Sequence, residues 1–149
     1  MNNKNILIVL ISIAFFILNT KCIKDSIKFS KDLEMYQLII MSIIFGFLVY
    51  NSSQIVKISK EPLNNKLQEK QAKYSTIIAV ILFLLLSNEA TYKLMLSNFP
   101  NTNNYIVLIH SILFYILYYY AYNHYVWNKI LKKHTSTTNL DTDSSPIDL

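Results

Sequence analysis

Two histidines, His110 and His124, have the type and spacing that point most directly to chemistry. Ionisable side chains inside a membrane are functional candidates, and His110 lies within a long apolar run with His124 near its end. The spacing of 14 residues puts both on nearly the same helix face, about four turns apart, as in helices that carry axial ligands for two haems. Each haem would need a second ligand, and the remaining histidine, His134, lies near the C-terminus, so a two-haem site is nearly excluded. One ligand completed by a partner subunit stays open, beside the simpler interpretation that His110 and Ser111 hydrogen-bond across a helix bundle.

Other catalytic or metal-binding patterns are missing from the sequence. Cys22 is the single cysteine, which excludes an intrachain disulfide and a paired-thiol redox centre. The apolar runs contain no Asp or Glu, which disfavours hydrolase and cation-transport chemistry. Every basic residue is lysine, and arginine is the residue best suited to bidentate phosphate contacts, so a nucleic-acid partner is not expected. We therefore expect no enzyme activity, no cofactor and no metal.

Composition and four apolar runs predict a membrane protein. The chain has 149 residues, of which 52% are hydrophobic and 15% charged, against about 25% charged in soluble domains. The runs are continuously apolar, which favours helices over a barrel because a barrel strand alternates in polarity. We predict an all-α bundle of four transmembrane helices in residues 1–134, with a disordered polar tail at 135–149. The expected spans are residues 5–23, 36–56, 72–88 and 105–127.

The first and third runs have further features. The first has a basic start and a short apolar core, as a signal peptide does, but the residues after it fit a cleavage site poorly. We favour a retained helix, and the signal peptide stays an alternative for residues 1–22. Before the third run, Glu61 and Pro62 indicate a helix start, so we expect a cytoplasmic helical lead-in, in which Glu69 and Lys73 have the spacing of an ion pair.

Lysines and aromatic residues indicate the orientation. Nine of the 14 lysines fall in the N-terminus, the second loop and the C-terminal segment, and five fall in the other two loops. Because lysine is enriched on the cytoplasmic side, we predict that both termini are cytoplasmic, in a bacterial inner membrane. Six aromatic residues crowd the end of the fourth run and are interpreted as an interfacial belt: Tyr118, Tyr119, Tyr120, Tyr122, Tyr125 and Trp127.

The function predicted from these features is contact with another protein inside the membrane. Helices associate in lipid through small residues and a few polar bonds, and the candidate contact residues are Ser42, Gly46, His110 and Ser111. An accessory subunit fits this pattern. The layout is also similar to that of the immunity proteins that protect bacteria from pore-forming colicins, which have a basic cytoplasmic loop and a basic end after the last helix. This resemblance is one of layout and carries over no functional residue. The alternative is a homo-oligomeric pore, a holin-like protein or a small transporter, so the expected partners are the lipid bilayer and either another membrane protein or further copies of this chain.

Overall fold

The computed structural model describes residues 3–26, 34–56, 65–100 and 105–132. Every regular element in these ranges is a helix, which confirms the all-α prediction for this part of the chain. The expected tail and the Glu61-Pro62 helix start lie outside the described residues. The elements are α1 (Asn3–Asn19), α2 (Lys21–Ser26), α3 (Glu34–Ile55), α4 (Asn65–Leu86), α5 (Glu89–Asn98), α6 (Ile106–Ala121) and the π-helical segment η3 (Tyr122–Lys132).

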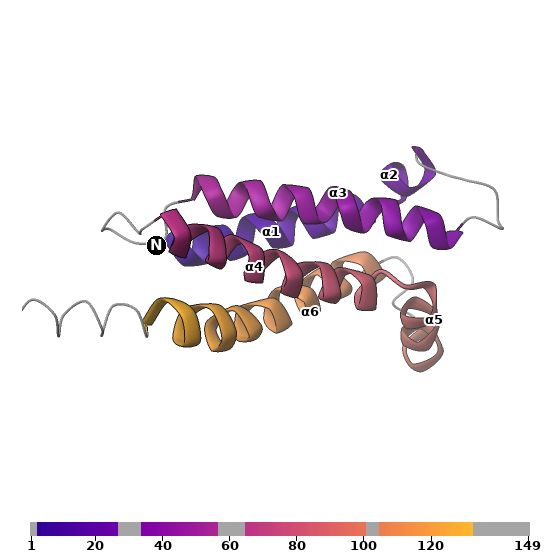
Figure 1. The fold of residues 1–149 in the computed structure, drawn as a ribbon. Helices are drawn as coiled ribbons and strands as arrows, with labels where there is room; N and C mark the ends of the chain where they lie inside the picture. Colours follow the sequence, from indigo (N-terminus) through magenta and orange to yellow (C-terminus); the bar gives the residue numbers. More distant parts are fainter. Residues whose placement is uncertain (1–2, 27–33, 57–64, 101–104, 133–149) are drawn as a thin grey trace, which may run out of the picture.

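Four long helices lie side by side as an up-and-down bundle, with η3 continuing α6 (Figure 1). The α1 helix packs against α3 and α6, and α4 packs against the same two helices, so the four form a closed ring. The start of α1 and the end of η3 lie at one end of the bundle, while α2 and α5 lie at the other (Figure 1). The short α5 turns away from the bundle axis.

Two helices are long and apolar enough to cross a membrane, within Met35–Ile55 and Ile106–Asn128. A third crossing is obtained if α4 and α5 count as one broken span, since they are bent by 55° at a short break. The α1 helix is apolar but only 17 residues long. The four predicted spans are therefore supported in part, and the segment after the third run, expected as a loop, begins with a helix.

Four phenylalanines meet at the centre of the bundle, one from each long helix. Phe15, Phe45, Phe83 and Phe114 are each at most 1% exposed. Phe15 stacks on Phe114 at 4.4 Å between ring centroids, and Phe45 stacks on Phe83 at 4.8 Å. Edge-on contacts of 5.6–6.2 Å join the two stacks, in the geometry that aromatic pairs prefer. We call this group the phenylalanine cluster. It fills the middle of the bundle.

The α3 and α4 helices approach each other closely through small residues. A Cβ atom at buried Gly46 would lie 2.9 Å from Cγ2 of Val80, which is nearer than van der Waals contact allows. One turn earlier in α4, the methyl group of Thr76 would lie at 3.7 Å. Small residues allow such close backbone approach between helices in lipid. The glycine thus serves packing within the chain.

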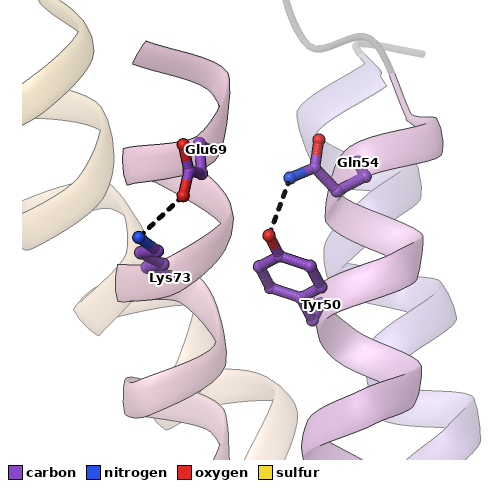
Figure 2. Close-up of polar contacts among 4 residues, drawn as sticks. All are labelled: Tyr50, Gln54, Glu69 and Lys73. Atoms are coloured by element: carbon purple, nitrogen blue, oxygen red, sulfur yellow. Dashed lines mark hydrogen bonds and ion pairs between the residues drawn. The ribbon is translucent and has the colours of Figure 1, made fainter. Parts of the chain in front are cut away.

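Near the end of the bundle that holds the chain's N-terminus, α3 and α4 each carry a pair of polar side chains spaced four residues apart. Figure 2 shows Glu69 and Lys73 paired along α4 at 2.7 Å, and Tyr50 accepting a 3.3 Å hydrogen bond from Gln54 along α3. The ion pair was predicted from its i,i+4 spacing and is confirmed. Both of its side chains are more than half exposed, so water screens the pair and it contributes little to stability. It lies near the start of α4 and keeps a carboxylate and an ammonium at the surface.

The interfacial-belt interpretation is wrong for two tyrosines. Tyr118 and Tyr122 are completely buried inside the bundle, whereas Tyr120 is 69% exposed. Six buried residues of α6 and η3 recur at every fourth position, with Ser111 also buried beside the second of them: Ile106, His110, Phe114, Tyr118, Tyr122 and Val126. A strict four-residue repeat drifts around an α-helix of 3.6 residues per turn, and the wider turn of a π-helix reverses that drift. The change to η3 at Tyr122 therefore keeps Tyr122 and Val126 facing inward.

Replacing Phe45 by alanine is expected to destabilise the bundle by about 2–4 kcal/mol. Large-to-small changes in soluble cores cost about 3–5 kcal/mol for Phe, and the transfer part is smaller in lipid, which is itself apolar. The measurement is reversible unfolding of the purified protein in mixed detergent micelles. The control is Phe47→Ala on the same helix, where the side chain is 68% exposed and the loss should stay below about 1 kcal/mol. Equal losses for the two variants would contradict a core at Phe45.

Candidate functional site

The phenylalanine cluster separates two polar regions of the bundle interior. The first, on the side of the chain's N-terminus, is a buried hydrogen-bond network that joins α3, α4, α6 and η3. Tyr118 and Ser75 share a hydrogen bond of 2.6 Å, and Ser75 in turn lies 3.2 Å from the hydroxyl of Ser53. One turn along each helix, Gln71 donates to the Tyr122 hydroxyl at 3.0 Å. All five side chains are at most 3% exposed. Buried hydroxyls need such partners, so the network fixes the register of these helices.

Lys4 ties the start of α1 to η3 at this same end. Its ammonium donates to Oδ1 of Asn123 at 2.8 Å and lies 4.9 Å from the ring centroid of Trp127. The hydrogen bond and the cation–π contact both keep the charge at the edge of the apolar bundle. This arrangement holds the chain together and provides no reactive group.

The four residues predicted as intramembrane contacts all lie within the chain's own bundle. Ser42 and Ser111 are 6% and 8% exposed, and each donates to a carbonyl of its own helix, of Ile39 and Val107 respectively. The expectation that Ser111 bonds across the bundle is therefore wrong. A role for these residues in contact with another protein stays a prediction.

His110 does not hydrogen-bond across the bundle either. Its side chain is completely buried, and neither ring nitrogen makes a hydrogen bond of good geometry, although the backbone of Ile106, one turn earlier in α6, is near enough to interact with the ring. The ring packs instead on Tyr92 of α5, with 4.2 Å between centroids. His124 is exposed and contacts Tyr125, so the two histidines do not share a face, because η3 changes the helical phase between them. Among the described residues no group of three or more His, Cys, Asp or Glu side chains could hold a metal ion.

Tyr92 is the centre of the second polar region, at the opposite end of the bundle. Its hydroxyl donates to Oδ1 of buried Asn19 at 3.3 Å, and the ammonium of Lys24 lies 4.5 Å from its ring centroid. With His110 against the same ring, Tyr92 links α1, α2, α5 and α6. Gln37 of α3 completes the region by donating to the backbone carbonyl of Lys24 at 2.8 Å. Side chains from five helices therefore converge at one place.

The α4–α5 bend that carries Tyr92 is built by the local sequence. Asn88 caps α5, and its side-chain oxygen accepts from the backbone N–H of Ala90 at 2.9 Å. Asparagine is a favoured N-cap, and an acidic residue such as Glu89 is favourable in the first turn. Glu89 and Lys93 then pair at 2.6 Å. The chain can therefore end α4 and begin α5 at an angle without leaving the new helix start unpaired.

A cavity of about 440 Å³ opens beside this bend. We call it the α4–α5 cavity. Its polar wall includes Asn19, Lys24, Gln37, Ser87, Glu89 and Tyr92. Methionine and leucine side chains of α3 form an apolar wall together with Phe83. The size is within the range of small-ligand sites, which are concave, largely apolar and carry a few polar groups. This cavity is the candidate functional site.

Two buried polar side chains at or next to the cavity have no partner in the bundle. Ser87 lines it and is 8% exposed, and its hydroxyl makes no hydrogen bond. His110 packs against Tyr92, and neither of its ring nitrogens has a hydrogen bond of good geometry. Burial also lowers the pKa of Lys24 from its usual value, because the ammonium is partly withdrawn from water. Unsatisfied donors and a desolvated cation are features of a site that accepts a ligand.

Sequence reasoning found His110 and did not find Tyr92, Lys24 or Ser87 as parts of a site. The sequence does indicate α5, because Asn88, followed by Glu89 and Lys93, marks a helix start after the third apolar run. That helix places Tyr92 one turn from its start. No local pattern, however, indicates that the tyrosine turns toward His110.

Comparison with protein-family models, with curated proteins and with solved structures finds no match to this chain. The class of protein therefore comes from the structure alone. The described residues form an all-helical chain with two helices, or up to three if the bent pair is one span, that are long and apolar enough to cross a membrane.

Replacing Tyr118 by phenylalanine is expected to cost about 0.5–1.5 kcal/mol of unfolding free energy, because it removes one buried hydrogen bond. The loss should shrink to near zero when Ser75 is already alanine, since the two residues share the bond. Unfolding of the single and double variants in mixed micelles gives this coupling. Tyr120→Phe, at a 69% exposed position, is the control and should be neutral. Additive losses in the double variant would show that the hydroxyls are not coupled.

Proposed function

We propose that this chain is a four-span membrane bundle that works by lateral contact with another membrane protein. The observation that carries the proposal is the phenylalanine cluster, which fills the centre of the bundle with apolar rings from all four long helices. A single copy offers no polar path through that layer. Intramembrane contact, as made by an accessory subunit or an immunity-type protein against a pore-forming toxin, needs only the outer faces of the bundle.

The proposed fourth span is α1. At 1.5 Å per residue its 17 residues span about 26 Å, somewhat less than the ~30 Å hydrocarbon layer. Its inner face packs into the bundle core through Leu7, Ile11 and Phe15, and its neighbours α3 and α6 lie alongside it. Lys4 reaches toward one interface and Lys21 follows its other end, so snorkelling can make up the missing length. Because α1 supplies Phe15, one of the four rings of the phenylalanine cluster, we favour a retained helix over a signal peptide for this segment.

The proposed orientation places both chain ends in the cytoplasm of a bacterial cell, at the inner membrane. In Figure 1 the start of α1, the end of α3, the start of α4 and the end of η3 lie at one end of the bundle. By sequence, nine of the 14 lysines belong to the N-terminus, the second loop and the C-terminal segment. The α4–α5 cavity then faces the outer side. Cytoplasmic enrichment of lysine is the physical basis of this assignment.

The native Cys22 offers a direct test of orientation, because it is exposed and lies in α2 at the proposed outer end. A membrane-impermeant maleimide added to intact spheroplasts is expected to label the wild-type protein. In a Cys22→Ser background, a cysteine in place of exposed Asn128 should be labelled only after the cells are broken. The reverse pattern would overturn the orientation.

The partner can be sought with photo-cross-linking residues at outward positions on three faces of the bundle. Suitable positions are Phe47 on α3, Ile81 on α4 and Ile112 on α6, each at least 52% exposed. After irradiation of native membranes, one face is expected to form a product with a different protein while the others react mainly with lipid. Products containing only further copies of this chain would refute the proposal and favour the homo-oligomeric pore, which conductance in liposomes would then test.

A further inference from the structure

Lys24 presents a charge to the α4–α5 cavity that the described part of the protein does not neutralise. The ion pairs of the described residues are Glu69–Lys73 and Glu89–Lys93, and neither includes Lys24. Its close neighbour is the ring of Tyr92 at 4.5 Å. A partly buried ammonium over an aromatic ring gains some attraction but keeps unused hydrogen-bond donors. An anionic ligand would supply the missing acceptors.

The rest of the polar wall is suited to the same charge. Ser87 provides a buried hydroxyl without a partner. Glu89 also lines the cavity, but its carboxylate is 2.6 Å from the ammonium of Lys93, so that pair adds no net charge. The charged residues of the described wall are therefore Lys24 and Glu89, and of these Lys24 is the one without an ion-pair partner among the described residues. Phosphate oxygens accept well from both an ammonium and a hydroxyl.

The opposite wall is apolar and lies on α3. Met35, Leu38 and Met41 line the cavity from one helix, with Phe83 of α4 behind them. Met35 lies at the start of the apolar window of α3 and the other two follow within it, so this wall runs from the helix end toward the membrane interior. A ligand that fits both walls has an anionic head and an apolar chain.

We propose that the α4–α5 cavity binds the phosphate group of an anionic phospholipid, with Lys24 and Ser87 at the phosphate and the α3 wall along an acyl chain. The site lies at the end of the bundle, where a lipid headgroup would stand. It does not depend on which protein the bundle contacts, so it and the proposed function can fail separately.

The test is native mass spectrometry of the full-length protein in detergent, titrated separately with phosphatidylglycerol, phosphatidylcholine and inorganic phosphate. The wild-type protein is expected to retain one phosphatidylglycerol and to bind phosphatidylcholine more weakly, because the choline cation offsets the phosphate charge that Lys24 would meet. Lys24→Gln should weaken phosphatidylglycerol binding by about tenfold or more, the range expected for loss of a charge-assisted hydrogen bond. The matched control is Lys21→Gln, an exposed lysine on the same short helix, with a change of about twofold or less.

A second variant keeps the proposal testable if Lys24→Gln does not fold, as judged by circular dichroism. Leu38→Trp fills the apolar wall and leaves Lys24 in place, so it should reduce lipid binding and leave any binding of inorganic phosphate unchanged. Equal losses for Lys21→Gln and Lys24→Gln, or equal binding of the two lipids, would overturn the site. Binding of inorganic phosphate, in its own titration, at concentrations similar to those of the lipid would overturn the acyl-chain part and identify a soluble phosphate as the ligand.

Discussion

Contact between the four aromatic rings of the phenylalanine cluster is the interaction on which the other features of the bundle depend. Each long helix contributes one ring, so the contact fixes the heights of all four helices relative to one another. In lipid the driving force is packing, because burial away from water is already achieved by the membrane. A layer of tightly stacked and edge-on rings is a strong source of such packing. It also divides the bundle interior into two polar regions with different roles.

The two polar regions differ in how their buried polar side chains are hydrogen-bonded. On the side of the chain's N-terminus, Ser75, Tyr118, Gln71 and Tyr122 pair across helices, and each buried polar group named there has a partner. At the other end, Ser87 and His110 are buried without one. A buried polar group without a hydrogen bond is costly, and the oxygens of Asn5 and Thr76, on the side of the chain's N-terminus, carry the same cost. Binding is proposed at the other end because Ser87 lines a cavity there and His110 lies against Tyr92, which lines the same cavity.

The bend between α4 and α5 creates the end of the bundle that holds the α4–α5 cavity. A straight continuation of α4 would carry Tyr92 along the bundle axis, away from Asn19 and Lys24. The Asn88 cap stops α4 and starts a helix at 55° to it, and the new helix lays Tyr92 over His110. The cavity is the space left between this turned helix and α3. The proposed lateral contact and the proposed ligand binding would then use separate parts of the molecule, the outer faces and the bent end.

The sequence by itself determined the helical class, the long apolar helices and the Glu69–Lys73 pair, because these depend on hydropathy and on spacing within one helix. It did not determine which side of each helix faces inward. Lipid and bundle interior are both apolar, so hydropathy does not distinguish buried Tyr118 from exposed Tyr120. The π-helical turn that separates His110 from His124 has no local signal either. Only the packing of the helices decided those orientations and brought Lys24, Ser87 and Tyr92 to one cavity. Lys24 lies on α2, Ser87 in the break between α4 and α5, and Tyr92 on α5, and the approach of these elements depends on contacts far apart in the chain.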